Sequence, residues 1–182
     1  MAGGFNVSRS VGTAENTGKV RRYYVEASHS SIIAAGDVVR LTGTADADGV
    51  AAVDRTTSGG VIAGVVASVD YNIAGENLSD TGLPALTAGY VFVHTDQAIE
   101  FEVDCTATLA AADVGLNASP DWAVATKSGG ITVTNVKLDS STKAATAALQ
   151  FRITGLLRDA AGVLGNRATV TINASALSGT GV

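Results

Sequence analysis

Ile99-Glu100-Phe101-Glu102-Val103-Asp104 decides the fold class, because its apolar and acidic residues alternate without exception. Such a period of two places the apolar side chains on one face of a β-strand and the carboxylates on the other. The same alternation recurs at residues 147–153 and 168–172, where Gln, Arg and Thr take polar positions. The pattern therefore predicts half-buried strands in a sheet with one apolar face.

Toward the N-terminus, further strands are predicted between turn signals, at residues 21–26, 38–41, 50–53, 61–69 and 90–94. The run 61–69 is apolar on both of its faces, which predicts burial on both sides. Asp48-Gly49 separates two of these strands and predicts a tight hairpin turn, because glycine accepts a positive φ without a Cβ clash.

Toward the C-terminus, residues 131–138 predict a strand whose apolar phase changes near Asn135, as it does at a β-bulge. Residues 109–114 form the one plausible helix, about one and a half turns long, and Gly115 is a natural stop for it. Closely spaced strands with turn signals between them are typical of barrels and sandwiches. The chain is therefore predicted to be all-β and antiparallel, a β-barrel or β-sandwich with one short helix.

The 182 residues are enough for one domain or two small ones. We expect the barrel or sandwich at residues 19–177, with a possible sub-boundary in the aperiodic region 71–89. Residues 1–18 are rich in Gly, Ser, Thr and Asn, which predicts a flexible, extended N-terminal arm; residues 178–182 are expected to be a flexible tail. The arm is either a frayed terminus or a segment that becomes ordered against a neighbouring subunit.

Composition disfavours several classes of partner. A net charge of −5 and an isoelectric point near 4.8 argue against nucleic acid, which is bound through clustered Lys and Arg. No apolar run approaches the roughly 18 residues that span a bilayer, and the start lacks the features of a signal peptide. We therefore expect no membrane association, and assembly in a cytoplasm. The single Cys105 excludes an intrachain disulfide and is expected to be a half-buried filler.

Tests for catalytic or metal chemistry give no candidate site. His29 and His94 lack a second ligand at motif spacing, and Asp46-Ala47-Asp48-Gly49 lacks the later acidic residues of a calcium loop. Glu100 and Glu102 share a strand face, where a solvated or intersubunit surface is favoured over a glycosidase pair. Neither a Gly-x-Ser-x-Gly elbow nor a phosphate-binding loop occurs. The sequence predicts no catalytic residue, no metal, no cofactor and no enzymatic activity.

Three regions are candidates for contacts with other proteins: the arm, the loop at 71–89 and Trp122. The loop is either a partner-binding loop or an ordinary mobile one. Trp122 follows Pro120 in a loop, where it is either a lid on the barrel end or an interface anchor. The candidate interface residues are Phe5, Val7, Val11, Tyr71, Asn72, Ile73, Glu76, Leu83 and Trp122.

An ordered set of motifs in the second half of the chain resembles tailed-phage capsid decoration, or cement, proteins. The motifs are Ala98-Ile99-Glu100-Phe101-Glu102-Val103, Ala112-Asp113-Val114-Gly115-Leu116-Asn117, Leu138-Asp139-Ser140-Ser141-Thr142, Leu164-Gly165-Asn166-Arg167-Ala168 and Val170-Thr171-Ile172-Asn173. The N-terminal half, through residues 34–39 and 60–67, is more loosely similar to the β-tulip domains of small cement proteins. The resemblance implies a β-tulip or jelly-roll-like barrel.

The resemblance also implies a function. Such proteins are non-enzymatic, structural virion components that bind the outer surface of an HK97-type phage capsid and cement neighbouring major capsid proteins. The implied partners are the major capsid protein and further copies of this chain, as a homotrimer or alternatively a homodimer. The implied location is the capsid exterior, after assembly in the host cytoplasm. The alternatives are a head-fibre, tail or host-surface carbohydrate-binding virion component, and a small hydrolase.

Overall fold

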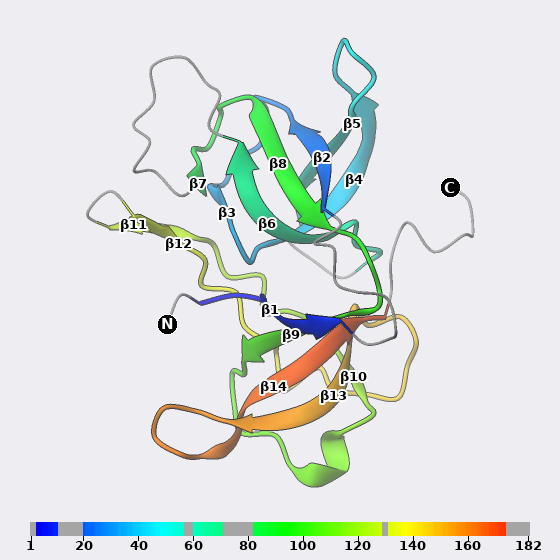
Figure 1. Ribbon diagram of the computed structural model, residues 1–182, viewed down its shortest axis with the longest axis vertical. Helices are drawn as coiled ribbons and strands as arrows, with labels where there is room; N and C mark the ends of the chain where they lie inside the picture. Colours follow the sequence, from blue (N-terminus) through cyan, green and yellow to red (C-terminus); the bar gives the residue numbers. More distant parts are fainter. Residues whose placement is uncertain (1–2, 11–19, 57–59, 71–81, 129–130, 174–182) are drawn as a thin grey trace.

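The computed structural model describes residues 3–10, 20–56, 60–70, 82–128 and 131–173 (Figure 1). Within these residues the regular elements are β-strands and one short 3-10 helix, η1 (Ala111–Asp113), and nearly all strand pairs are antiparallel. The prediction of an all-β, antiparallel fold is therefore confirmed. The helix expected at 109–114 is a single 3-10 turn instead of an α-helix of one and a half turns.

Five strands close into a small barrel, in the upper half of Figure 1. Their order is β2 (Val20–Val25), β5 (Ala51–Arg55), β4 (Val38–Ala45), β6 (Gly64–Asp70) and β8 (Gly89–His94). All neighbours are antiparallel except β2 and β5, whose parallel bridge between Tyr24 and Ala52 completes the ring. Small side chains fill the narrow interior, chiefly Val25, Val39, Val53, Val66, Val69, Val91 and Val93.

Two short strands and one tight turn complete the barrel. β3 (Ile33–Ala34) pairs with β7 (Gly82–Leu83), and the pair adds Ile33 and Leu83 to the barrel core. Between β4 and β5, Gly49 has a φ of +80°, and its N–H donates to the Asp46 carbonyl over 3.2 Å. The hairpin turn predicted from Asp48-Gly49 is therefore confirmed.

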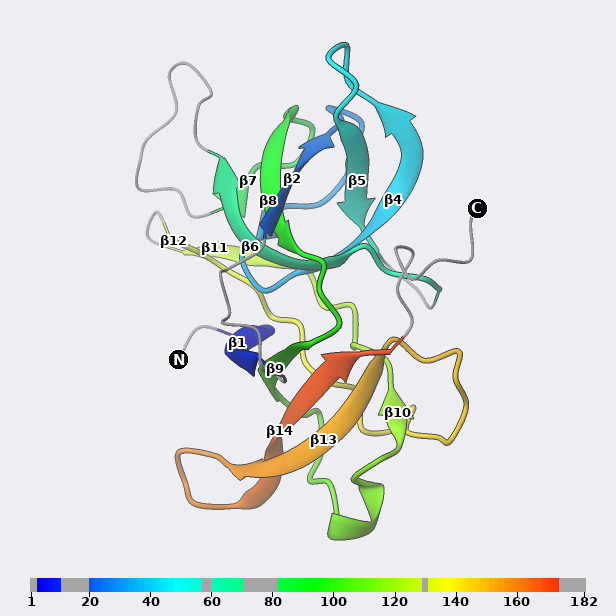
Figure 2. The same cartoon turned by 45° about the vertical axis from the view of Figure 1, so that its right-hand side comes forward.

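A second sheet of five strands forms the lower half of the molecule (Figures 1 and 2). Its order is β1 (Asn6–Ser10), β9 (Ile99–Asp104), β14 (Leu164–Ile172), β13 (Phe151–Arg158) and β10 (Asn117–Ala118). The apolar residues of the alternating segments meet on one face of this sheet, as predicted. They are Ile99, Phe101, Val103, Phe151, Ile153, Ala168, Val170 and Ile172.

The barrel and the lower sheet share a continuous core. Val38, Ile62 and Val65 come from the barrel half of the chain, yet they pack in the same cluster as Phe101 and Phe151 of the lower sheet. We call this contact region the junction. The chain passes from the barrel to the lower sheet between β8 and β9, at residues 95–98. This crossing comes after the region 71–89, because β7 and the start of β8 still belong to the barrel half.

The N-terminal segment enters the lower core instead of forming a free arm. Phe5 is 3% exposed and stacks on Phe151, with ring centroids 4.2 Å apart, and Asn6–Ser10 pairs with β9. The predicted flexible arm is therefore wrong for residues 4–10. The physical reason is that one buried aromatic ring and a row of strand hydrogen bonds offset the ordering entropy of this polar segment. Residues 11–18 of the predicted arm and the predicted tail, 178–182, lie outside the described residues.

Two local predictions are also wrong. The alternation does not change phase at Asn135, because the buried residues continue in one register as Thr132, Thr134, Val136 and Leu138. Two threonines thus point inward where apolar residues were expected. The run 61–69 is not buried on both faces throughout, because Val61 and Ser68 are exposed and β6 begins only at Gly64.

Replacement of Phe5 by Ala tests whether the N-terminal segment belongs to the fold. We expect Phe5→Ala to lower the free energy of unfolding by about 3–5 kcal/mol, because it opens a cavity between Phe101 and Phe151. Val7→Ala, on the same segment but 38% exposed, should cost less than about 1 kcal/mol. Chemical denaturation of both variants measures the difference, and equal small losses would contradict the assignment.

Candidate interaction site

The structure separates the predicted interface residues. Leu83 is buried in the barrel core and Phe5 in the lower core, so neither is available as an interface residue. Val7 is exposed on β1, an edge strand of the lower sheet. Trp122 is partly buried against the lower core. The remaining candidates, Val11, Tyr71, Asn72, Ile73 and Glu76, lie outside the described residues.

Trp122 takes part in the junction through its backbone. Its φ of +58° is unusual for a residue with a side chain, and it turns the Trp122 carbonyl toward the end of β5. There Arg55 Nη2 donates to the carbonyl oxygens of Trp122, over 2.8 Å, and of Ala123. A buried guanidinium of the barrel therefore fixes the loop after β10.

Asp37 is the buried counter-ion of Arg55. Its carboxylate is fully buried, its Oδ2 lies 3.8 Å from Arg55 Nε, and it accepts hydrogen bonds from the Ala34 N–H and from the Thr134 hydroxyl. Burial raises the pKa of Asp37, and the bonds from Thr134 and Ala34 and the charge of Arg55 oppose that rise. The buried Thr134 missed by the pattern is thus a ligand of this carboxylate.

The polar face of the lower sheet carries a second charge network. Glu100 is only 2% exposed, because Arg9 of β1 and Thr154 of β13 both donate to its carboxylate. The neighbouring Glu102 accepts from Ser8 and from Arg167, each over 2.9 Å. The expected solvated or intersubunit surface is therefore wrong for Glu100, whose partners lie within the chain. The pairing of β1 with β9, which the sequence did not indicate, brings Arg9 there.

Electrostatics keeps Glu100 ionised in this setting. Burial alone would raise the pKa of its carboxyl group. Hydrogen bonds from Thr154 and Arg9, with the positive charge of Arg9, outweigh burial and leave the pKa below its usual value. A carboxylate with a lowered pKa stabilises the fold most at neutral pH and loses that contribution in acid.

A two-stranded ribbon presents apolar side chains to solvent beside the junction (Figure 1). It consists of β11 (Thr126–Ser128) and β12 (Ile131–Val133), which pair only with each other among the strands of the described chain. Ile131 is 57% exposed and Val124, just before the ribbon, is 49% exposed. The sequence predicted one strand at 131–138, whereas β12 ends at Val133; the Gly129-Gly130 turn signal would have indicated a separate hairpin.

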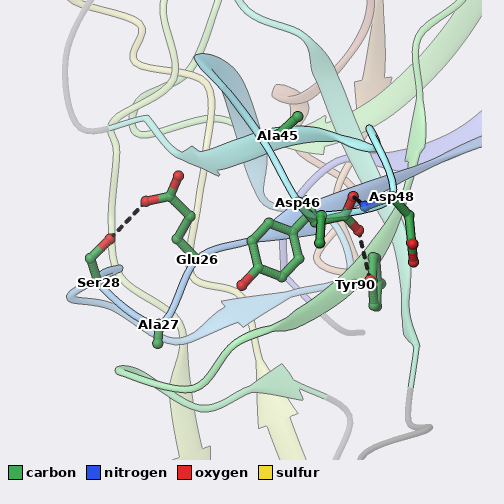
Figure 3. Close-up of a pocket in the computed structure, with 9 residues that line it drawn as sticks. Glu26, Ala27, Ser28, Ala45, Asp46, Asp48 and Tyr90 are labelled. Atoms are coloured by element: carbon green, nitrogen blue, oxygen red, sulfur yellow. Dashed lines mark hydrogen bonds between the residues drawn. The ribbon is translucent and has the colours of Figure 1, made fainter.

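An open hollow of about 630 Å³ lies on the barrel, between the residues that follow β2 and the β4–β5 hairpin (Figure 3). Glu26 and Ser28 stand on one side of it, and Asp46, Asp48 and Tyr90 on the other. The Tyr90 hydroxyl donates to Asp46 Oδ2 over 2.7 Å. This bond, with those from the backbone of Val50 and Asp48, lowers the pKa of Asp46, so its carboxylate is charged at neutral pH.

Two tyrosine rings belong to the hollow. Tyr24 of β2 and Tyr90 of β8 are register partners, and their ring centroids are 5.5 Å apart at an interplanar angle of 56°. The guanidinium of Arg22 covers one face of the Tyr90 ring at 3.6 Å and pairs with Asp70. Neither tyrosine was among the candidate interface residues predicted from the sequence, and both lie on the outer face of the barrel.

Two further titratable side chains, Cys105 and His94, pack against residues of the lower core. Burial raises the pKa of the Cys105 thiol to about 12, which leaves it protonated at neutral pH. Burial lowers the pKa of His94, whose ring packs edge-on against Phe101 at 6.1 Å. Among the described residues, no group of three or more His, Cys, Asp or Glu side chains could hold a metal ion.

Comparisons with known proteins identify no relative. No family model matches the chain, no curated protein matches it, and no solved structure matches the fold. In the part of the chain that the structure describes, no helix is long and apolar enough to cross a membrane.

A double-mutant cycle tests the buried pair at the junction. Asp37→Ala should lower the free energy of unfolding by about 3–5 kcal/mol, because it leaves the Arg55 charge buried without a counter-ion. Adding Arg55→Met removes that charge, so the double variant should be more stable than the sum of the single losses by about 1–3 kcal/mol. Additive losses in urea denaturation would show that the two side chains do not interact.

The lowered pKa of Glu100 predicts a pH-dependent stability difference. Glu100→Gln should be less stable than the parent protein above about pH 5, where the carboxylate is ionised in both the folded and unfolded chain. Because the folded pKa lies below the unfolded one, the difference should shrink as pH falls through the folded pKa. Denaturation of both proteins from pH 7 to pH 3 measures it. A constant difference across this range would contradict the assignment.

Proposed function

We propose that this chain is a structural virion protein, a capsid decoration protein that binds the outer surface of an HK97-type phage capsid. In this role it cements neighbouring major capsid proteins and acts without catalysis. The proposal starts from the motif set that resembles cement proteins, and the barrel and sheet are compatible with it. The observation that carries it is the exposed ribbon, which offers both apolar side chains and strand edges to a partner.

The ribbon is suited to bind by strand addition. A two-stranded ribbon is marginally stable by itself, and its base is held here by the contact of Thr132 with Gly82 of β7. The ribbon joins no other sheet of the described chain, and Ile131 and Val124 present apolar area to a neighbouring strand beside it. Such a contact is small, so the binding of many copies to a lattice relies on avidity among them.

A joined barrel and sheet also suit a cementing role. The junction unites the two parts through a shared core and the Asp37–Arg55 pair, so a contact on one part restrains the other. A rigid protein loses little conformational entropy on binding, which makes small contacts more effective. Copies associated as trimers, or alternatively as dimers, would each bridge different capsid subunits.

Copy number on purified particles tests the proposed function. Virions of the phage that encodes this chain should contain it in hundreds of copies, and density from cryo-electron microscopy should place it on the capsid exterior. The same density gives the symmetry of association. A handful of copies, a position at the tail, or absence from the particle would reject capsid cementing.

The ribbon itself is tested by binding to capsids that lack the protein. Ile131→Asp should reduce binding by at least about tenfold, because it places a charge in the apolar contact. The matched control is Val163→Asp, an equally drastic change at an exposed aliphatic residue of the distant β13–β14 turn. Both variants should keep the parent melting temperature. Equal binding by the two variants would exclude the ribbon as the docking element.

A further inference from the structure

We propose that the hollow on the barrel is a binding site for a neutral glycan, in which Tyr24 and Tyr90 stack on sugar rings and Asp46 accepts hydrogen bonds from sugar hydroxyls. This inference does not depend on capsid binding. It uses a different surface from the ribbon and is tested without a capsid.

The tyrosine pair is a preorganised stacking surface. Tyr24 and Tyr90 lie side by side on paired strands of the closed barrel, so the backbone holds the two residues as neighbours, and their ring centroids are 5.5 Å apart. The Tyr90 ring is also held by its hydroxyl bond to Asp46 and by Arg22 on one face. An aromatic ring with an apolar face and a polar edge complements a pyranose, which has an apolar C–H face and hydroxyls around its edge.

The polar groups of the hollow are hydrogen-bond acceptors for O–H donors. The Glu26 carboxylate already accepts from the hydroxyls of Ser28 and Thr44, and Asp46 accepts from the Tyr90 hydroxyl. Charge-assisted bonds of this type are stronger than neutral ones, and Asp46 is held for them by two backbone N–H groups. A sugar ring carries several hydroxyls close together, and these can donate to the carboxylates of the hollow.

The lining selects against other ligand classes. It contains three carboxylates and no Lys, Arg or His, so phosphate, sulfate and sialic acid groups are repelled. A basic peptide complements the charge, but the cation site over Tyr90 is already occupied by Arg22, which is paired with Asp70. The hollow is open to solvent, so a longer glycan can extend beyond it.

A glycan array with the full-length protein is the first test. The probes are oligosaccharides of glucose, galactose, mannose and N-acetylglucosamine, together with sialylated and sulfated counterparts and an oligo-lysine peptide. We expect binding to at least one neutral oligosaccharide and none to the anionic probes. Binding of anionic glycans alone, binding of oligo-lysine alone, or no binding to any neutral probe would each overturn the proposal.

Variants then assign the binding to the hollow. Tyr24→Ala and Asp46→Ala should each weaken binding of the neutral glycan by about tenfold or more, measured by isothermal titration. Tyr24→Phe should keep binding within about threefold, because the ring provides the stacking surface. The matched control is Phe92→Ala, which removes an aromatic ring from the same outer face of β8 but outside the hollow.

Unfolding is distinguished from loss of the site by the melting temperature and circular dichroism of every variant. Phe92→Ala should bind as the parent protein does, and a stable Tyr24→Ala variant should not. If stable Tyr24→Ala and Asp46→Ala variants bind the glycan like the parent, the site lies elsewhere and the proposal fails. Capsid binding by these same variants should be unchanged, which separates this proposal from the cementing role.

Discussion

The rest of the structure depends on a buried carboxylate–guanidinium pair at the junction. Asp37 lies at the start of β4 and Arg55 at the end of β5, and together they reach the loop after β10 and the segment that contains Thr134. A buried ion pair adds little net stability, since desolvation offsets attraction, but its geometry is strict. The pair thus fixes how the barrel meets the lower sheet. The backbone at Gly4 also packs closely on Thr134, because a Cβ atom at this glycine would lie only 2.2 Å from the Thr134 methyl group.

The strands of this fold were predictable, and their partners were not. Alternation with a period of two identified β9, β13 and β14 because each faces a core on one side only. Phe5 and Arg9 gave no such signal, because β1 is an edge strand whose order comes from contacts with residues some 90 positions away. Two buried threonines, Thr132 and Thr134, misled the pattern because hydropathy does not mark a polar residue as inward-facing. The Thr134 hydroxyl is buried without cost because it donates to Asp37.

The candidate sites were even less accessible to sequence reasoning. An interface anchor was sought among large apolar residues in loops, yet Phe5 and Leu83 are core residues, because a small chain with few aromatics uses them inside. Ile131 of the ribbon and the two tyrosines of the hollow are ordinary strand residues. They reach solvent because they lie on the outer face of the closed barrel or on the free ribbon. Barrel closure depends on pairing between strands far apart in the sequence, so a local pattern does not reveal it. The turn at Asp48-Gly49 was predictable since its signal is local.

The proposed attachment to a surface lattice makes particular demands on the molecule. Each copy makes small contacts, so binding is effective only when little conformational freedom is lost with each. The junction meets that requirement within the chain, because a shared core and the Asp37–Arg55 pair join barrel and sheet. The ribbon lies beside this junction, so a partner bound as proposed would contact the chain where barrel and sheet meet. The tyrosine hollow lies on the barrel, where a ligand can be held without disturbing the lower sheet.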